Sequence, residues 1–294
     1  MSAGSSTGIT DQDPASNLQA RVRHITRTIL LSDEEFGLFR DLIYRLARIS
    51  LSDQKKALVA GRLNRRVRHL RLPSFKSYYD YVHSPAGVSE LQLMVDALTT
   101  NETSFFREPE HFHFLGKEIL AKRQGESKSV RIWSAACSSG EEPYSLAMVC
   151  HDRLGTDRWQ ILATDISRTV LERAERGLYS ISAAPRIPEY YLKKYALKGV
   201  GNMEGMFTFN DEIKKGIQFR SMNLAERKPC ESQFDCIFLR NVMIYFDRET
   251  KSQIVSHMED CLITGGYLFI GHSESLHGLG SGLQSIQPSV YRKT

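Results

Sequence analysis

Apolar side chains in the first hundred residues recur at the spacing of amphipathic helices. One stripe, at i, i+4, i+8 and i+11, consists of Val59, Leu63, Val67 and Leu70. Another stripe starts near Leu18, and Ser32 with Glu35 has the form of a capping box that begins a further helix. Residues 18–100 therefore predict a small all-helical domain. Residues 1–17 carry small polar and acidic side chains and predict a disordered tail.

The pattern changes after Val130, where short apolar runs alternate with helical stretches. The runs predicted to be strands are residues 130–135, 161–165, 217–221, 234–239, 267–272 and 289–293. Strands that alternate with helices indicate βαβ units and a mostly parallel sheet. Residues 179–216 interrupt the alternation with prolines, a Gly-Val-Gly turn and short β-like runs, which predicts an insertion with its own antiparallel sheet. Residues 101–294 are thus expected to form an α/β domain that carries this insertion.

The composition is that of an ordinary soluble globular protein. The chain has 294 residues, of which 41% are hydrophobic and 25% charged, and this length favours two domains. No apolar run approaches the ~20 residues of a membrane helix, and the N-terminus lacks a secretory signal pattern. The five cysteines are scattered without a CxxC, so we expect no disulfide framework, no zinc site and a reducing, cytoplasmic location. His111 and His113 point to different sides of a predicted helix, so no metal role is expected.

Positive charge is concentrated in the helix predicted over residues 55–71. Its seven basic residues, with no acid between them, are Lys55, Lys56, Arg62, Arg65, Arg66, Arg68 and Arg71. Together with the formal net charge of +5, this run favours an acidic partner. Nucleic acid, an anionic membrane surface and an acidic protein are all open at this point. A solvated helix face without a partner is the alternative interpretation.

The strand at 130–135 runs into a loop of small residues, and a helix is expected to start at Pro143. Small side chains let the backbone approach a ligand closely, but the GxGxxG of a pyrophosphate site is missing, since only Gly140 is present. Asp165 ends the next strand, 25 residues after Gly140, where an acid can accept hydrogen bonds from ribose hydroxyls. Asp165 could instead cap the helix that follows, although Ser167 could cap it equally well. A nucleoside site without phosphate on such a sheet points to S-adenosylmethionine.

Five longer segments carry a more specific signal. They are TTNETSFFREPEHF (99–112), WSAACSSGEEPYSLA (133–147), ATDIS (163–167), FDCIFLRNVMIYFD (234–247) and GGYLFIGHSE (265–274). In this order they resemble the chemotaxis receptor glutamate methyltransferase family, the CheR-type enzymes, over roughly residues 30–294. The resemblance implies a Rossmann-like class I methyltransferase fold behind an all-α N-terminal domain. It also implies a monomer that uses S-adenosylmethionine, releases S-adenosylhomocysteine and esterifies glutamates in the cytoplasmic region of methyl-accepting chemoreceptors.

The same resemblance assigns roles to single positions. The implied cofactor-binding residues are Asn101, Thr103, Arg107, Glu141, Asp165, Asn223, Leu224, Arg240 and Asn241. The aspartate is implied to hold the ribose, and the Asn-Leu pair to flank the adenine. Arg107 and Tyr245 are the implied catalytic residues. Simpler alternatives are a helix-start acid for Glu141, an interdomain ion pair for Arg107 and a packed aromatic ring for Tyr245.

These residue types suit methyl transfer to a carboxylate. A glutamate side chain, with a reference pKa of about 4.3, is already ionised at neutral pH, so the reaction needs no general base. Arginine stays protonated and cannot act as a base, so Arg107 is expected to position the cofactor carboxylate or the incoming glutamate. Because an anion and a sulfonium cation react to give neutral products, a dry and well-aligned site favours the reaction.

Glutamate-bearing helical bundles, the implied substrates, give the basic helix a partner. The predicted substrate-binding residues are Arg62, Arg65, Arg66 and Arg68. The Gly-Val-Gly turn at 199–201 resembles the loop with which some family members hold a receptor's C-terminal tail peptide, and strand addition is a suitable docking mode. A nucleic-acid methyltransferase is disfavoured because the basic run contains no aromatic residue. A non-catalytic scaffold with the methyltransferase fold is the third alternative.

Overall fold

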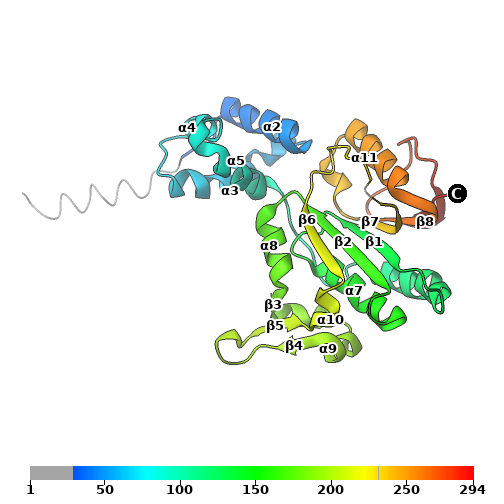
Figure 1. Cartoon of the computed structure of the whole chain (residues 1–294). Coiled ribbons are helices and arrows are strands. Elements are labelled where there is room, and N and C mark those ends of the chain that lie inside the picture. The colour runs from blue at the N-terminus through cyan, green and yellow to red at the C-terminus, as the bar shows by residue number, and fades with distance from the viewer. Residues whose placement is uncertain (1–28, 231) are drawn as a thin grey trace, which may run out of the picture.

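The computed structural model describes residues 29–230 and 232–294, and Figure 1 shows a helical part and a sheet-containing part joined by an extended segment. The predicted stripe that starts near Leu18 lies mostly outside the described residues. The N-terminal part is all-helical, as predicted. Its helices are α2 (Asp33–Ala47), α3 (Lys56–His69), α4 (Phe75–Val82) and α5 (Val88–Leu98), with the 3-10 turns η1 (Asp53–Lys55) and η2 (Pro85–Gly87) between them.

The local sequence explains how these helices begin and how they pack. Ser32 and Glu35 form the predicted capping box, in which the Glu35 N–H donates to the Ser32 side chain and the Ser32 N–H donates to the Glu35 carboxylate. The Ser74 side chain caps α4 by a single bond, accepting from the Ser77 N–H. Val59, Leu63 and Val67 of the predicted α3 stripe are fully buried. Burial of one apolar stripe per helix therefore builds the core of this domain.

A seven-stranded sheet forms the centre of the second part, in the order β6-β2-β1-β7-β8-β10-β9. Its strands are β1 (Val130–Ala135), β2 (Trp159–Asp165), β6 (Ile217–Ser221), β7 (Phe234–Leu239), β8 (Leu262–Ile270), β9 (Gln284–Gln287) and β10 (Val290–Arg292). The first five strands of this order pair in parallel, and β10 pairs antiparallel with β8 and β9. The chain passes from β1 to β2 and β6 and then returns to the other side of β1 with β7. Such a reversal places a ligand site at the carboxyl ends of the strands beside it.

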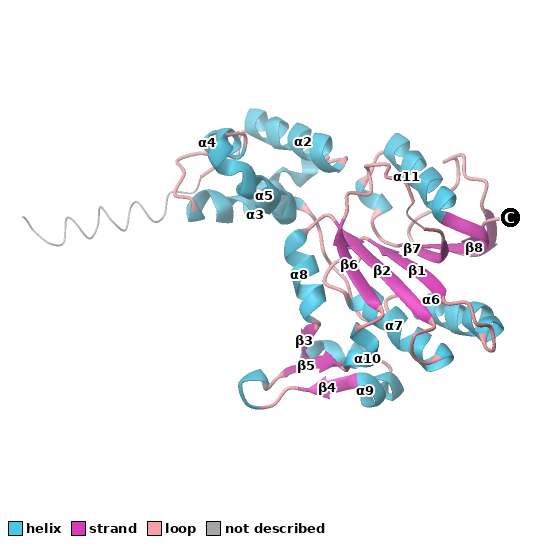
Figure 2. Cartoon of the chain, viewed as in Figure 1, coloured by secondary structure: helices cyan, strands magenta, loops and turns pink. Residues whose placement is uncertain are grey.

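Helices surround this sheet, as Figure 2 shows, and alternate strand residues pack against different ones. Phe238 belongs to the core that contains α7 (Glu141–Leu154), whereas Ile237 belongs to the core that contains α11 (Arg248–Cys261). The core around α11 continues into the helical domain, so the two parts share apolar contacts. The remaining elements near the sheet are α6 (Pro109–Phe114), η3 (Leu115–Leu120), η4 (Ala121–Arg123), α8 (Arg168–Arg176) and η7 (Met243–Tyr245).

The predicted insertion is present as a three-stranded antiparallel sheet in the order β3-β5-β4, and it extends beyond α8 and α7 in Figure 1. Its elements are β3 (Leu178–Ser180), η5 (Ile181–Arg186), α9 (Glu189–Tyr195), β4 (Ala196–Lys198), η6 (Gly201–Met203), β5 (Met206–Phe209) and α10 (Asp211–Lys214). The helices α9 and α10 are too short to show a helical period in the sequence. Tyr144 of α7 stacks on Phe209 with ring centroids 4.9 Å apart, so aromatic packing fixes the insertion to the main domain.

Strand β8 starts at Leu262, five residues earlier than predicted, and two features were not predicted at all. Strand β9 is not predicted because its sequence, QSIQ, is polar; it forms by pairing with β10. Cys230 and Cys261 form a disulfide, although no disulfide was expected. These cysteines are 31 residues apart in sequence and meet only because the segment before β7 returns to the end of α11. Among the described residues, no helix has both the length and the apolarity to span a membrane.

Arg66, one of the predicted substrate-binding residues, has a partner inside the helical domain. Its Nε and Nη2 atoms donate to the Glu90 carboxylate at 2.7 and 2.6 Å, and the Tyr78 hydroxyl donates to the same carboxylate at 2.9 Å. Glu90 is only 4% exposed, and its hydrogen bonds raise the pKa of Arg66 above its usual value. The sequence could not show this pair because Glu90 lies on α5, two helices further on. Arg66 therefore links α3 to α5 within the helical domain.

We expect Arg66→Ala to lower the free energy of unfolding by about 3–5 kcal/mol, because it leaves the buried Glu90 carboxylate without its cation. Arg68→Ala on the exposed side of the same helix is the matched control and should change it by no more than about 0.5 kcal/mol. Urea unfolding of both variants measures the difference. Equal stability of the two variants would contradict the assignment of Arg66 to the fold.

Candidate active site

A cavity of about 280 Å³ lies between the helical domain and the sheet, at the carboxyl ends of β1, β2 and β7. Its position is the one that the reversal of strand order predicts. Of the predicted site residues, those that line it are Arg62, Asn101, Thr103, Arg107, Asp165, Asn223, Leu224, Arg240, Asn241 and Tyr245. Glu141, Arg65, Arg66 and Arg68 are not among the lining residues. Residues far apart in sequence thus converge on one site, which both domains build.

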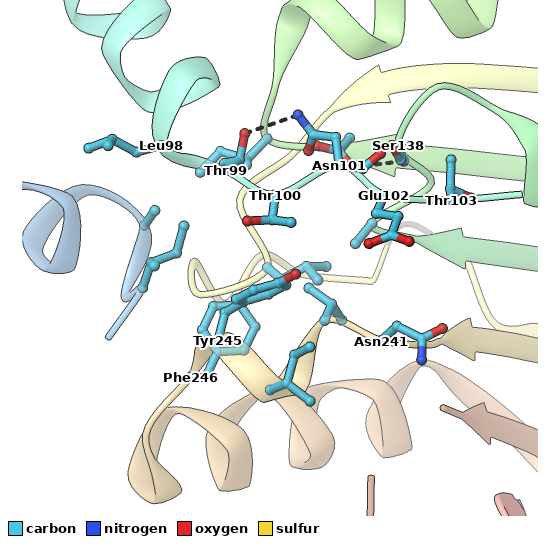
Figure 3. A pocket seen from close by; sticks show the side chains of 18 of the residues that line it. Leu98, Thr99, Thr100, Asn101, Glu102, Thr103, Ser138, Asn241, Tyr245 and Phe246 are labelled. Atoms are coloured by element: carbon cyan, nitrogen blue, oxygen red, sulfur yellow. Dashed lines mark hydrogen bonds between the residues drawn. The ribbon is translucent and has the colours of Figure 1, made fainter. Parts of the chain in front are cut away.

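The extended segment between the domains forms one wall of the cavity (Figure 3). The Asn101 side-chain amide donates to the Thr99 hydroxyl at 3.2 Å, and the Asn101 backbone carbonyl accepts from the Ser138 hydroxyl at 2.9 Å. Ser138 belongs to the small-residue loop after β1, so this bond joins the two sides of the site. Arg107 Nη1 donates to the Glu102 carbonyl at 3.1 Å. The interdomain ion pair considered for Arg107 is thus replaced by a bond within its own segment.

Arg62 of α3 reaches this wall from the helical domain. Its guanidinium donates to the carbonyls of Leu98 and Thr99 at 2.8 and 3.1 Å and to the Thr100 hydroxyl at 3.0 Å. Burial lowers the pKa of Arg62, while Tyr245 acts in the opposite direction. Arg62, predicted to bind substrate, lines the cavity. It also holds the interdomain segment, which carries the predicted cofactor-binding residues Asn101 and Thr103.

The loop after β1 is shaped by unusual backbone conformations. Ala136 and Ser138 are left-handed, with φ of 67° and 51°, and Gly140 has φ of 97°. A Cβ atom on Gly140 would lie 2.8 Å from both the Ala174 Cβ and the Tyr179 hydroxyl, so only glycine fits there. These turns direct the Ser138 N–H toward the carboxylate of Asp165.

Asp165 stands at the end of β2 and is 7% exposed. Its two carboxylate oxygens accept from the Ser138 and Ser167 N–H groups, both at 2.9 Å. Burial raises its pKa, and these two hydrogen bonds oppose the rise. The Ser167 side chain makes no cap hydrogen bond to α8. Asp165 therefore orders the loops on both sides of β2 and still presents further lone pairs to the cavity.

The two acids at the start of α7 differ in position. Glu141 accepts from the Ser139 hydroxyl at 2.7 Å and does not line the cavity, whereas Glu142 does. Glu142 accepts from Ser134 at 2.7 Å and from Arg240 at 2.9 Å. The sequence prediction selected the first acid, but the structure gives the second the cavity position.

Arg240 is the buried centre of an ion-pair network below the cavity. Its Nη1 donates to Glu142 at 2.9 Å, and its Nη2 donates to Glu108 at 3.0 Å and to the Arg107 carbonyl. Burial raises the pKa of Glu142 despite this partner. For Glu108 burial acts in the same direction, but the Arg240 charge and hydrogen bond outweigh it and the pKa is lowered. Neither Glu108 nor Glu142 was among the predicted site residues, although both lie within the quoted segments.

His111 lies beside this network with 1% of its surface exposed. Its ligand atoms and those of Glu108 and His272 lie within 4.8 Å of one another, a grouping that the sequence did not indicate. Burial and the Arg240 charge lower the pKa of His111 from 6.5 to about 4. Because this pKa leaves His111 uncharged near neutral pH, the positive charge next to Glu108 comes from the Arg240 guanidinium.

The loop after β7, which carries Asn241 and Tyr245, forms the opposite wall and lies across the cavity from the interdomain segment in Figure 3. Asn241 is left-handed, with φ of 56°, and its amide donates to Glu108 at 3.2 Å. The Tyr245 carbonyl accepts from the Ser50 N–H at 2.8 Å, so the helical domain contacts this loop directly. On a third side, the Asn223 amide donates to the Leu46 carbonyl at 2.8 Å. The helical domain therefore closes the cavity over the sheet.

Two family models together match most of the chain. The model described as the CheR methyltransferase SAM binding domain matches residues 101–291, and the one described as the CheR methyltransferase all-alpha domain matches residues 34–99. The chain belongs to the CheR methyltransferase family. It is 41% identical over 258 residues to the chemotaxis protein methyltransferase of Salmonella typhimurium, covering 87% of this chain and 88% of that protein. It is 36% identical over 275 residues to the Borreliella burgdorferi protein of the same name, covering 90% and 96%.

Membership of the CheR methyltransferase family confirms the predicted fold and makes the sheet domain an S-adenosylmethionine-binding methyltransferase domain. The side chains around the cavity fit this cofactor. Asp165 offers carboxylate lone pairs suited to ribose hydroxyls, and Ile166, Met222 and Leu224 offer apolar surface suited to a flat adenine ring. Glu142 lines the same cavity, with its charge already paired with Arg240.

Proposed function

We propose that this CheR methyltransferase transfers a methyl group from S-adenosylmethionine to glutamate side chains of bacterial chemoreceptors in the cytoplasm, and releases S-adenosylhomocysteine. The relatives named chemotaxis protein methyltransferase support a role in chemotaxis. The observation that carries the proposal is that Arg107, Asp165 and Tyr245 line one and the same cavity. This cavity lies beside the basic helix α3. A cofactor pocket next to a positively charged surface suits an acidic protein substrate.

The residues around the cavity can perform this transfer without a general base. Bound S-adenosylmethionine supplies a methyl group on a positively charged sulfur, which the oxygen of an ionised glutamate can take as the carbon–sulfur bond breaks and its electron pair stays on sulfur. Arg107 gives one N–H to the Glu102 carbonyl, and a guanidinium has five, so donors are left to orient a carboxylate. Tyr245 forms a wall near Arg62 and limits where the methyl group and the glutamate can meet.

The exposed side of α3 is proposed as the receptor-docking surface, defined here by Arg65 and Arg68. Both are exposed, unlike Arg62 and Arg66, which bond within the protein. Opposite charge on a glutamate-bearing receptor helix would steer it toward the cavity that Arg62 adjoins. Because the charges are exposed, this attraction should weaken as salt screens it.

The edge strand β4 is proposed to hold a receptor tail peptide by strand addition. It pairs with β5 on one side only; Leu197 at its centre is 53% exposed, and Val200 just beyond its end is 81% exposed. A Cβ atom on Gly199 would lie 2.0 Å from the Met203 carbonyl, so the turn after β4 depends on glycine. Such a tether would raise the effective concentration of receptor glutamates at the cavity.

Labelled methyl groups from S-adenosylmethionine should appear on receptor-containing bacterial membranes and be released by mild alkali as volatile methanol. Arg107→Ala and Tyr245→Phe should lower turnover, by about 10²-fold for Arg107→Ala, with little change in stability, because they disturb alignment and not the core. Alkali-stable label would indicate nitrogen or nucleic-acid methylation. Cofactor binding without transfer to any receptor would favour a non-catalytic scaffold, and full activity of both variants would remove the roles of these two residues.

Arg65→Ala and Arg68→Ala together should reduce the rate of receptor methylation several-fold at low salt and much less at high salt, because screened charges steer weakly. Calorimetric binding of S-adenosylhomocysteine should not change. Lys122→Ala, which removes an exposed positive charge outside the helical domain, is the control. A loss of rate that does not depend on salt, or that Lys122→Ala reproduces, would contradict docking at α3.

A peptide with the sequence of a receptor's C-terminal tail should bind the intact protein, and Gly199→Ala should weaken that binding, because the added Cβ displaces the turn after β4. Isothermal calorimetry with a scrambled peptide as control measures it. Methyl transfer to receptors without a tail should stay at the wild-type level in this variant. Absence of binding to any tail peptide would remove the tether and leave the methyl-transfer proposal intact.

A further inference from the structure

The Glu274 carboxylate holds the loop after β7 by accepting hydrogen bonds from backbone N–H groups of that loop. Its Oε2 accepts from the N–H groups of Asn241 and Gly271 at 2.9 and 2.7 Å, and its Oε1 accepts from the Met243 N–H at 2.8 Å. Two of these three donors belong to the loop that forms a wall of the cavity. Glu274 itself does not line the cavity, so it acts on the site only through this loop.

Asn241 adopts a left-handed conformation, which asparagine tolerates better than most residues with a side chain, and its neighbours hold it there. Two carboxylates fix it from different sides. Glu108 accepts from the Asn241 side-chain amide at 3.2 Å, and Glu274 accepts from the Asn241 backbone N–H. Neither contact alone fixes both the backbone and the side chain.

Close packing at Gly271 makes this arrangement specific. A Cβ atom at Gly271 would lie 2.5 Å from the Asn241 side-chain nitrogen and 2.9 Å from the Glu274 Oε2. The absence of that atom lets the ends of β7 and β8 approach the carboxylate. The turn between Gly271 and Glu274 is closed by a backbone hydrogen bond, in which the Glu274 N–H donates to the Gly271 carbonyl at 2.9 Å.

The consequence reaches Tyr245 through the turn η7. Met243, whose N–H is held by Glu274, is the first residue of this turn, and Tyr245 is its last. The Tyr245 carbonyl at the far end accepts from Ser50 of the helical domain. The turn is thus anchored at its start by Glu274 and at its end by the other domain.

We propose that Glu274 is a positioning residue for methyl transfer, which sets the placement of Asn241 and Tyr245 without touching the substrate. The proposal rests on the proposed function of the same cavity. Glu274→Gln preserves size but replaces one accepting oxygen with an NH₂ group, which faces an N–H donor in either orientation. Misplacement of reacting groups by a fraction of an ångström to 1 Å can reduce turnover by up to about 10²-fold.

Glu274→Gln should lower the kcat of receptor methylation at least about tenfold while the KM for the receptor changes less than about threefold. In a Tyr245→Phe background, Glu274→Gln should reduce kcat by a much smaller factor than in the wild type, because both changes act through the position of residue 245. Glu259→Gln is the matched control, since Glu259 also accepts a backbone N–H, from Gly282 at 3.1 Å, in a loop away from the cavity. An unchanged kcat, an undiminished loss in the Tyr245→Phe background, or a loss equal to that of Glu259→Gln would overturn the proposal.

Hydrogen exchange of the amides of residues 241–246 separates this proposal from the proposed function. Glu274→Gln should speed exchange in this loop relative to the wild type and to Glu259→Gln, whether or not the protein methylates a receptor. If the wild type forms no alkali-labile ester, the proposed function fails and the exchange data still decide the role of Glu274. Unchanged exchange in the loop would overturn it.

Discussion

The buried guanidinium of Arg240 is the interaction on which the site depends. A charge that is removed from water must be paired, and Arg240 meets this need with Glu142, Glu108 and the Arg107 carbonyl. These partners come from the start of α7 and from the segment that follows the interdomain connection. One side chain at the end of β7 therefore fixes the relative positions of three segments that surround the cavity. The walls cannot move independently without leaving a buried charge unpaired.

The cavity also depends on the contact between the domains. Arg62 binds the segment that carries Asn101, Ser50 binds the Tyr245 carbonyl, and Asn223 binds the Leu46 carbonyl. Each of these bonds joins a helical-domain residue to a wall of the cavity. A substrate that docks on α3 would therefore lie next to side chains that shape the cofactor pocket. The proposed docking surface is therefore close to the residues that form the cavity.

The sequence predicts those features that depend on local periodicity. The strand of VRIWSA, the capping box at Ser32 and the buried stripe of α3 follow from side-chain spacing alone. Motif order adds the family and a set of cofactor-site residues, all of which except Glu141 line the cavity. The pairing of Arg66 with Glu90, the disulfide of Cys230 and the acceptor role of Glu274 could not be predicted, because each joins residues that only the tertiary fold brings together. Strand β9 could not be predicted for the same reason. Its polar sequence has no strand pattern, and it becomes a strand only by pairing with β10.

The charges of α3 and of the cavity floor divide into two groups with different physical consequences. Arg240, Glu108, Glu142 and Arg66 are paired inside the protein, so they set geometry and are costly to disturb. Arg65 and Arg68 are exposed, so their attraction acts at longer range and is weakened by salt. Methyl transfer from a sulfonium to a carboxylate removes a pair of opposite charges and therefore benefits from fixed, already compensated surroundings. If the substrate is a glutamate, as proposed, internal pairing of the cavity charges means that it need not reorganise them, and the exposed charges of α3 would attract it.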